Sequence, residues 1–530
     1  MPKFTIDGKE LTVEPGTTVL QAAKAHGIPI PYFCWHPKLS IDGSCRMCQV
    51  EVEKMPKLQI ACNTPIVDGM VVHTETDRVK AARQAVMELL LINHPLDCPI
   101  CDEAGECKLQ DFTFQYGVPH SRFEEPKRRL EKRMEIGPRV MLDQERCILC
   151  RRCVRFCREI PKTGELVVEG RADFSVITTD PGRRLDNRYS INTVDICPVG
   201  ALTSRDFRFK VRVWFLKDTP SICTGCSNGC NIHISAYKDR VYRFLPRRND
   251  AVNETWMCDD GRLSYRRIQS ADRIRAPRLR DDGTGEGAIS QATAPWDIAI
   301  EAASRRLRTA RETGGAQAVG AVASAHATNE DLFLFQKFCR EVLGIERPGM
   351  IVPTWEPDDL LIKEEMAPNV AGARALGIGD ADDARATLER CERGEIAALV
   401  VLGSDLLLAD DRAKVLAALS KAGTIVCLDT HESDLSRIAH VVLPAQSFAE
   451  KDGTMTNVKS RVQRLRPAIR PVGEAKAEWE ILSLLAARMG HAFAGASPAD
   501  ILKEIANEVE AFRGVTLERV GSQGVPLAGA

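Results

Sequence analysis

The spacing of the cysteines constrains this chain more than any other feature of its sequence. The chain holds 19 cysteines in 530 residues, and 16 of them lie between Cys34 and Cys258. Its first residues form a strand–turn pattern and lack the charged and then apolar layout of a signal peptide, which favours a cytosolic setting. Thiols stay reduced there, so dense and regularly spaced cysteines favour metal sites over disulfides.

Three groups of residues in this region have an unambiguous metal-ligand spacing. The first set, C-x10-C-x2-C-x13-C, comprises Cys34, Cys45, Cys48 and Cys62. The second set, H-x3-C-x2-C-x5-C, comprises His94, Cys98, Cys101 and Cys107. The sets are numbered by their order in the chain, and a third set is described below. The fourth set, C-x2-C-x3-C-x27-C, comprises Cys223, Cys226, Cys230 and Cys258. Thiolates bind iron–sulfur clusters and zinc alike, so zinc stays open as an alternative, above all for the second set with its histidine.

The third set offers five cysteines for four positions. Its members are Cys147, Cys150, Cys153, Cys157 and the distant Cys197, which precedes a proline as in bacterial ferredoxins. The last cysteine of such a run serves a second cluster in two-cluster ferredoxins, but no complementary run follows here. We therefore assign Cys147, Cys150, Cys153 and Cys197, and predict that Cys157 is a buried thiol without a cluster. Neighbouring arginines either offset the cluster charge or form an exposed helical face; they are Arg151, Arg152 and Arg155.

The remaining pattern divides the chain into two kinds of structure. Residues 1–15 predict a hairpin around Asp7-Gly8, followed by a helix from Thr18 to Gly27 and a strand at 49–53, which is typical of a ferredoxin-like β-grasp module. A helix is expected at 78–92 and a solvated linker at 124–133. After about residue 272, strands at 316–324, 396–402 and 424–428 alternate with helices at 296–308, 328–343 and 411–421. This alternation predicts a doubly wound α/β region, with a loose tail from Gly521.

Composition and motifs exclude several functions. The formal net charge is −1, which gives no reason to expect nucleic acid as a partner, and no apolar stretch of about 18 residues is present to span a bilayer. The sequence has no P-loop, no G-x-G-x-x-G after a strand and no nucleophile elbow. NADH and FMN are therefore expected on a partner chain. Three single cysteines are interpreted as core or surface residues; they are Cys339, Cys391 and Cys427.

The four sets, in this order, resemble those of the large iron–sulfur subunit of respiratory complex I, NADH:quinone oxidoreductase. The resemblance rests on the long first gap of the first set and on three short segments. These are Asn93-His94-Pro95, Gly105-Glu106-Cys107 and Cys197-Pro-Val-Gly-Ala-Leu202. It implies one [2Fe–2S] cluster on the first set and three [4Fe–4S] clusters on the others. An imidazole ligand is neutral where a thiolate carries a negative charge, so the second cluster should be reduced more easily than an all-cysteine equivalent.

The fourth set and the second half of the chain resemble molybdopterin oxidoreductases. The closest stretch runs from Ala439 to Arg464. Two features depart from active molybdenum enzymes: the half is only about 260 residues long, and no cysteine stands where the metal ligand belongs, since Cys339 lies within a helical pattern. Ser460 also replaces the glycine usual before the following arginine. We therefore expect a scaffold domain without molybdopterin.

The predicted fold is an α+β series of [2Fe–2S] and [4Fe–4S] ferredoxin-like modules followed by an α/β molybdopterin-oxidoreductase-like domain lacking the pterin. The expected segments are 1–78 for the [2Fe–2S] domain, 79–118 for the second set, 138–210 for the third, 216–272 for the fourth and 273–530 for the α/β domain.

The resemblance implies an iron–sulfur subunit of a proton-pumping enzyme. Electrons would pass from a flavin- and NADH-binding subunit to the [2Fe–2S] cluster, then to the Cys147 cluster, the His94 cluster and a membrane-side subunit, with the fourth cluster off this line. Partners would be the flavin subunit, other peripheral-arm subunits of complex I and, indirectly, the membrane arm. The expected location is the cytoplasmic face of a bacterial inner membrane, peripherally bound. A subunit of an NAD-linked formate dehydrogenase or hydrogenase, and a zinc-bearing scaffold, stay open as alternatives.

Overall fold

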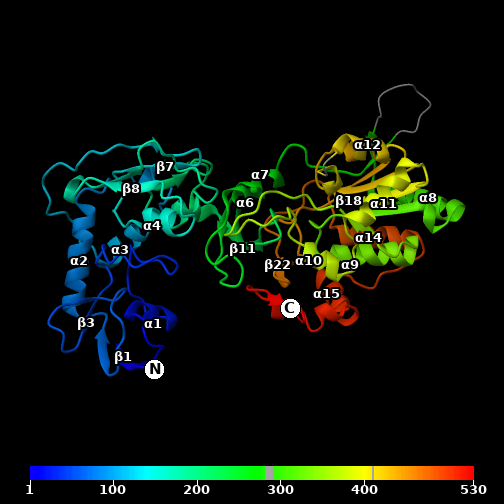
Figure 1. The fold of residues 1–530 in the computed structure, drawn as a ribbon. Coiled ribbons are helices and arrows are strands. Elements are labelled where there is room, and N and C mark those ends of the chain that lie inside the picture. Colours follow the sequence, from blue (N-terminus) through cyan, green and yellow to red (C-terminus); the bar gives the residue numbers. More distant parts are fainter. Residues whose placement is uncertain (281–290, 409–410, 530) are drawn as a thin grey trace. The chain divides into compact units, whose positions relative to one another are not determined.

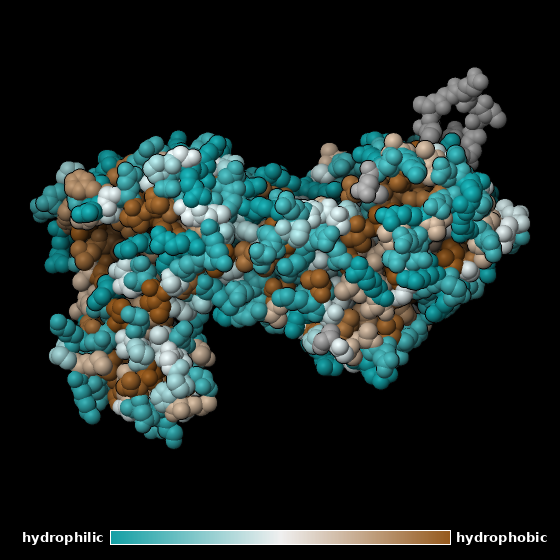
Figure 2. Space-filling view, viewed as in Figure 1, coloured by the Kyte–Doolittle hydropathy of each residue, from teal (hydrophilic) through white to brown (hydrophobic). Residues whose placement is uncertain are grey.

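The computed structural model describes residues 1–280, 291–408 and 411–529. The chain divides into two compact units, Met1–Leu216 and Lys217–Ala530 (Figure 1). Positions 281–290, 409–410 and 530 of the predicted α/β segment lie outside the described residues. On the face drawn in Figure 2, hydrophilic side chains cover much of each unit and hydrophobic ones show in smaller patches between them. No described helix combines the length and apolar character needed to cross a membrane.

The first part of unit 1 is a five-stranded sheet with one helix against it, which contains the predicted hairpin, helix and strand at 49–53 and two further short strands. Asp7 and Gly8 both have positive φ angles, 46° and 81°, which is the backbone of the tight turn that joins the first two strands. Thr18 caps the helix through the backbone N–H of Gln21. The elements are β1 (Lys3–Ile6), β2 (Lys9–Thr12), α1 (Val19–Ala25), β3 (Gln49–Val52), β4 (Gln59–Ile60) and β5 (Met70–His73), in the sheet order β2-β1-β5-β3-β4.

Two helices flank the second set, one before it and one after it. They are α2 (Asp77–Leu91) and α3 (Lys108–Tyr116), with a 3₁₀ turn at Cys98–Ile100 between them. The fully buried guanidinium of Arg83 in α2 donates to Glu75 Oε1 (2.9 Å), Tyr116 Oη (3.2 Å) and the main-chain oxygen of Gln49 (3.2 Å). One side chain therefore ties α2 to both α3 and β3.

The segment 124–133 has no helix or strand and no buried residue, as expected of a solvated linker, but two of its lysines anchor it to the rest of unit 1. Lys127 Nζ donates to the main-chain oxygens of Leu91 and Ile92 at 2.8 Å. Lys132 lies 2.6 Å from Asp97 and 2.8 Å from Glu145. Most of these partners are distant in sequence, which is why the local charge pattern did not reveal them.

The rest of unit 1 carries the third set. A small sheet has the order β10-β7-β6, a separate hairpin pairs β8 with β9, and two short helices stand beside them. The elements are β6 (Met134–Glu135), β7 (Val140–Leu142), α4 (Arg152–Glu159), β8 (Leu166–Glu169), β9 (Val176–Thr179), α5 (Asn192–Asp195) and β10 (Leu202–Ser204), with 3₁₀ turns at Ala172–Phe174 and Val213–Phe215.

Unit 2 begins with a three-stranded antiparallel sheet and two short helices that hold the fourth set. They are β11 (Lys217–Ile222), β12 (Asn231–Tyr237), β13 (Arg240–Pro246), α6 (Asp259–Leu263) and α7 (Tyr265–Ile268). Cys223 and Cys230 lie in the loop between β11 and β12, and Cys258 is the N-terminal cap of α6.

A seven-stranded sheet forms the centre of unit 2, in the order β15-β14-β20-β19-β18-β16-β17. Its strands from β17 to β20 run parallel, and both faces are buried: Val400 and Leu402 lie in one hydrophobic cluster, Leu399 and Val401 in the other. The strands are β14 (Arg278–Arg280), β15 (Gln291–Thr293), β16 (Val319–Ala323), β17 (Gly349–Met350), β18 (Ala398–Leu402), β19 (Ile425–Asp429) and β20 (Val441–Pro444). The doubly wound prediction is confirmed.

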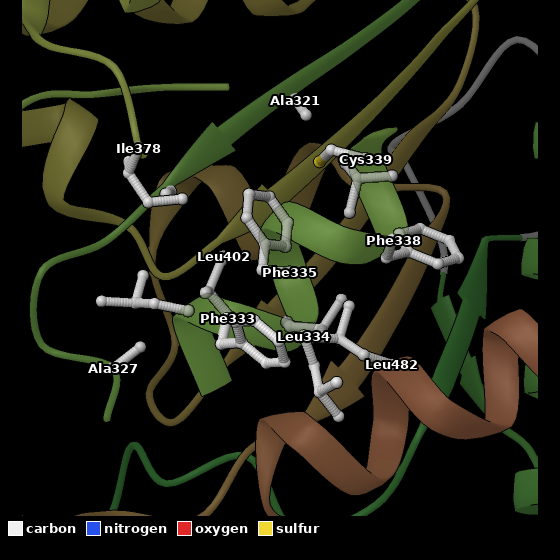
Figure 3. Packing of buried hydrophobic residues seen from close by; sticks show 14 of the residues in the cluster. Ala321, Ala327, Phe333, Leu334, Phe335, Phe338, Cys339, Ile378, Leu402 and Leu482 are labelled. Atoms are coloured by element: carbon white, nitrogen blue, oxygen red, sulfur yellow. The ribbon is translucent and has the colours of Figure 1, made fainter. Parts of the chain in front are cut away.

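The helices that follow in unit 2 pack against this sheet, against one another or against the small sheet described below. They are α8 (Trp296–Gly314), α9 (Asn329–Lys337), α10 (Val370–Ala375), α11 (Ala381–Glu392), α12 (Arg412–Leu419), α13 (Asp434–Ile438), α14 (Glu478–Arg488), α15 (Pro498–Glu508) and α16 (Leu517–Val520). A π-helix at Phe338–Leu343 continues α9, and 3₁₀ turns stand at Ala316–Ala318, Asp405–Leu408 and Glu510–Phe512. Figure 3 shows Phe335, Cys339 and Leu482 among the buried side chains packed there.

A second small sheet contains the end of the chain. Its strands are β21 (Gly453–Thr456), β22 (Arg461–Leu465) and β23 (Val525–Pro526), in that order. Val525 pairs with Val462 and Pro526 with Arg461, so the prediction of a loose tail from Gly521 is wrong. The pairing spans about sixty residues of sequence, a distance over which local composition carries no information.

Candidate iron–sulfur cluster sites

The four thiols of the first set meet in one buried site. Cys62 lies within hydrogen-bonding contact of Cys34 and Cys48, and Cys34 also contacts Cys45. Contact with Cys34 and Cys48, followed by burial, raises the pKa of Cys62, whereas contact with Cys45 and then with Cys62 lowers the pKa of Cys34, and contact with Cys62 lowers the pKa of Cys48. Four thiolates this close repel one another unless positive charge stands between them, which is the environment that an iron–sulfur cluster or a metal ion supplies.

The thiols of the third set surround an apolar cavity. It encloses about 350 Å³ of empty space, its open mouth included. The lining cysteines are Cys147, Cys150, Cys153 and Cys197, and the walls include Leu142, Ile148, Ile177, Val199 and Leu202. Burial raises the pKa of all four thiols, so they become ligands only when a cluster compensates their charge. These residues fit a [4Fe–4S] cluster.

Cys157 does not line this cavity. It lies fully buried in α4, where burial, and then the neighbouring carboxylate of Glu165, raise the pKa of its thiol. This position is the one predicted for a cysteine without a cluster, and the ligand assignment itself remains a prediction.

The arginines beside the third set differ from one another. Arg151 is exposed and is the N-terminal cap of α4, in a left-handed conformation (φ 54°). Arg152 and Arg155 are buried, so the interpretation of an exposed helical face is wrong for these two. An argument from helical charge patterning fails here because the guanidinium groups find main-chain oxygen acceptors inside the unit.

The second set lies at the end of α2 and the start of α3. Cys101 is buried, Cys107 half-buried and Cys98 exposed. Burial, followed by the positive charges of Arg146 and Lys127, lowers the pKa of His94 to about 4. The imidazole is therefore neutral at physiological pH, the form that ligates metal.

Unit 1 brings its three sets together around one hydrophobic core. Cysteines from all three sets pack there against Phe33, Met47, Met87, Leu109, Val199 and Ala201; they are Cys34, Cys45, Cys107, Cys147, Cys150 and Cys197. The loop after Cys197 also touches the second set. Cys107 Sγ lies 3.9 Å from the main-chain oxygen of Pro198, and a Cβ on Gly200 would lie 2.2 Å from Cys101 Sγ.

The fourth set surrounds a second cavity, within unit 2. It encloses about 310 Å³ of empty space, its mouth included, and its lining cysteines are Cys223, Cys226, Cys230 and Cys258. Asn228 Nδ2 donates to Cys230 Sγ at 3.0 Å, and the backbone N–H of Gly261 donates to Cys258 Sγ at 3.3 Å. Such bonds to sulfur stabilise a reduced cluster. These residues also fit a [4Fe–4S] cluster.

Three cysteines lie outside the four sets, and the described side chains form no site for a single metal ion. Over the described ranges, no group of three or more His, Cys, Asp or Glu side chains is arranged to hold one metal ion. Cys339, Cys391 and Cys427 are buried and stand apart from the four sets, as predicted for core residues.

A larger cavity lies at the carboxyl ends of β16, β18 and β19, the edge at which open parallel sheets bind their ligands. It encloses about 1870 Å³ of empty space, its mouth included, and no cysteine lines it. Its carboxylates outnumber its cations, since Asp260, Asp405, Asp429, Glu432 and Glu478 face Arg267, Arg412 and Lys451. Lys451 is moreover paired with Asp331 (2.7 Å) and Glu478 (2.5 Å). These residues do not fit a phosphate-bearing metal cofactor that needs a thiol ligand.

Comparison with protein families matches five segments of the chain. The matching descriptions are "2Fe-2S iron-sulfur cluster binding domain" at residues 2–77, "NADH-ubiquinone oxidoreductase-G iron-sulfur binding region" at 83–122, "NADH-quinone oxidoreductase subunit 3, ferredoxin-like domain" at 137–203, "NADH-ubiquinone oxidoreductase NDSU1/NuoG-like, 4Fe-4S domain" at 216–266 and "Molybdopterin oxidoreductase" at 364–488. The predicted fold class of [2Fe–2S] and [4Fe–4S] domains followed by a molybdopterin-oxidoreductase-like domain is confirmed.

Individual relatives agree with these segments. The G subunit of the NADH-quinone oxidoreductase of Rickettsia bellii is 42% identical over 342 residues, which is 64% of this chain and 48% of the relative. The mitochondrial NADH-ubiquinone oxidoreductase 78 kDa subunit of Candida albicans is 43% identical over 300 residues, 56% of this chain and 41% of the relative. The matches thus span about half the length of these relatives. A chain of an NAD⁺-reducing [NiFe]-hydrogenase structure is 33% identical over 40% of this chain and 91% of its own, with a TM-score of 0.37.

Proposed function

Because this chain is homologous to the G subunits of NADH-quinone oxidoreductases, we propose that it is the electron-transferring iron–sulfur subunit of a proton-pumping NADH:quinone oxidoreductase. In this proposal the chain relays electrons from a flavin subunit towards quinone and is active only within the complex. Bound clusters supply one-electron transfer, and the chain supplies ligands, burial and hydrogen bonds.

One observation carries the proposal: three ligand sets from separate stretches of sequence pack around a single apolar core. Such a shell keeps water from the clusters and keeps them close to one another. A scaffold that used zinc to stabilise separate loops would have no need for this convergence.

The proposed cofactors follow from the four sets. We assign one [2Fe–2S] cluster to the first set and one [4Fe–4S] cluster to each of the other three, with the sixteen ligands named above. We propose the route from the first set to the third and then to the second, as the resemblance implies; Arg155, which binds the first and third sets, and Pro198, which contacts Cys107 of the second set, accord with it. The fourth cluster, carried by unit 2, is proposed to lie off this route.

Partners and location are proposed on the same grounds. FMN and NADH would bind a flavin subunit, other peripheral-arm subunits would flank the chain, and the membrane arm would be reached indirectly. The complex would stand on the cytoplasmic face of a bacterial inner membrane. We retain the five predicted segments, 1–78, 79–118, 138–210, 216–272 and 273–530, as proposed domains, with no molybdopterin in the last.

Electron transfer in membranes that contain the assembled complex tests the proposal. Cys150→Ala removes a ligand of the proposed relay, and Cys230→Ala removes a ligand of the fourth set. We expect Cys150→Ala to abolish quinone reduction by NADH while the flavin subunit still reduces ferricyanide, and Cys230→Ala to lose one EPR signal and keep quinone reduction. Quinone reduction that persists in Cys150→Ala would refute the relay, and its loss in Cys230→Ala would refute the off-route assignment.

A further inference from the structure

Three side chains on one face of helix α4 form hydrogen bonds to the loop that carries Cys34. Arg152, Arg155 and Glu159 stand at positions i, i+3 and i+7 of this helix, so their side chains leave it on the same side. All three bind residues between Cys34 and Ser40, which are more than a hundred positions earlier in the chain. The helix itself begins within the third set, directly before Cys153.

Arg155 contacts a proposed ligand of each of two clusters. One terminal nitrogen, Nη2, donates to the main-chain oxygens of Cys34 in the first set and of Cys150 in the third set, the latter at 3.3 Å. The other, Nη1, donates to the main-chain oxygen of Ser40. The guanidinium group thus lies between two cluster loops and holds both.

Arg152 repeats the same bridge one helical turn earlier. Its Nη2 donates to the main-chain oxygen of Trp35 at 2.6 Å, next to Cys34. Its Nη1 donates to that of Ile196 at 2.9 Å, next to Cys197. Glu159 is the third side chain that binds this loop, and it accepts hydrogen bonds from the N–H (2.8 Å) and the hydroxyl (2.5 Å) of Ser40.

These two arginines carry buried charge. Arg152 is 4% exposed and Arg155 is 7% exposed. Their described hydrogen-bond acceptors are main-chain oxygens, with no carboxylate among them, and the Nε atom of each has no hydrogen-bond partner. A buried cation without a counter-charge is strongly unfavourable. Thiolate-ligated clusters on both sides would supply the missing negative charge.

We propose that Arg152 and Arg155 are positioning residues for electron transfer between the first and third sets, which fix the gap between the two clusters and raise their reduction potentials. The inference rests on the proposed function. A fixed positive charge stabilises the more negative, reduced state of each cluster, which raises its potential. The shared hydrogen bonds of Arg155 hold the two loops in one arrangement.

Reductive titration of the assembled complex, followed by EPR, tests this inference. The variants are Arg155→Met, which removes charge and hydrogen bonds, and Arg155→Lys, which keeps the charge. Arg158→Met is the matched control, because Arg158 lies on the same helix, is exposed and loses the same charge. We expect Arg155→Met to lower the midpoint potentials of both clusters and slow electron transfer between them. Arg155→Lys should restore the potentials in large part but not the rate, and Arg158→Met should match wild type.

The outcomes separate the two proposals. If wild type lacks the clusters, the proposed function fails before any variant is compared. If wild type carries them and Arg155→Met gives the same potentials and transfer rate as Arg158→Met, the inference is overturned while the proposed function stands. If Arg155→Met fails to assemble clusters, Arg155→Lys decides: a rate equal to wild type would overturn the positioning role.

Discussion

Two glycines of the fourth set lie at different distances from the same thiol. A Cβ added to Gly261 would stand 2.9 Å from Cys223 Sγ and 3.3 Å from Cys258 Sγ, whereas one added to Gly225 would stand 3.6 Å from Cys223 Sγ, an ordinary contact. A sulfur that ligates iron cannot retreat from such a clash without leaving the cluster. The side-chain-free position 261 is therefore part of the site, although no spacing rule for cysteines includes it.

Substitution of these glycines gives the first prediction. Gly261→Ala should lose the cluster of the fourth set. The loss amounts to about four iron atoms per chain and one EPR signal. Gly225→Ala, the matched control beside the same thiol, should keep both. Iron analysis and EPR of the two purified variants measure this, and a Gly261→Ala chain with full iron content would contradict the assigned geometry.

A buried carboxyl group in unit 2 links stability to pH. Glu330 is 0% exposed and accepts hydrogen bonds from the N–H and hydroxyl of Thr454, both at 2.8 Å. Burial raises the pKa of Glu330 from 4.5 to about 7. Between these values the folded chain keeps a proton that the unfolded chain releases, so the free energy of unfolding falls as pH rises, by about 3 kcal/mol at most.

The second prediction is that Glu330→Gln removes this pH dependence. The neutral side chain should leave the stability of unit 2 close to wild type at pH 5 and increase it at pH 8, because wild type then carries a buried charge. Calorimetric melting of the full chain across this range measures the effect, with the exposed Glu392→Gln as control. Parallel pH profiles for wild type and Glu330→Gln would contradict it.

At the scale of elements, local signals explain most boundaries, and distant contacts explain the exceptions. The hairpin around Gly8 and the capped helix after Thr18 follow from turn and capping residues that are neighbours in sequence. The prediction ends helix α8 at Arg308 because residues 309–314 lack apolar periodicity. The helix continues to Gly314, because the first residue that ends it is Gly315, with φ 70°. The buried arginines of α4 and the anchors of residues 124–133 depend on acceptors elsewhere in the chain, which a local pattern cannot reveal.

Helix α2 offers a prediction at this scale. Arg83→Met removes a buried guanidinium that bonds Glu75, Tyr116 and Gln49, and leaves these acceptors without their donor, so it should lower the stability of unit 1 by about 2–3 kcal/mol. Arg78→Met, on the same helix, breaks only surface contacts, among them the pair with Glu51, and should cost under about 1 kcal/mol. Thermal melting of the cluster-loaded chain compares the two. Equal losses of stability would show that Arg83 does not tie the three elements together.

At the scale of the whole molecule, the sequence could predict the ligand sets but not their neighbours. The second set lies between the first and the third in sequence, yet in the folded unit Arg155 links the loops of the first and third sets, and Pro198, beside Cys197, contacts Cys107 of the second set. Cysteine spacing predicts the ligands within one loop, but it does not predict how loops from different segments pack against one another. Which of the sets are neighbours is therefore known only from the folded unit.

The second unit limits what the molecule can do alone. Its large cavity lacks a thiol and carries an excess of carboxylates, which does not suit a molybdenum cofactor. Among the described residues, the proposed ligands are those of electron carriers, and none is assigned to a substrate. This is the basis for proposing a conducting subunit of a larger complex instead of a self-sufficient enzyme.

Metal and sulfide analysis of the full chain, purified without oxygen, tests the central claim most directly. One [2Fe–2S] and three [4Fe–4S] clusters require about 14 iron atoms and as many acid-labile sulfides per chain. The account predicts this content with neither molybdenum nor stoichiometric zinc. Zinc in place of iron would contradict the electron relay, and molybdenum would instead identify a subunit of a formate dehydrogenase type.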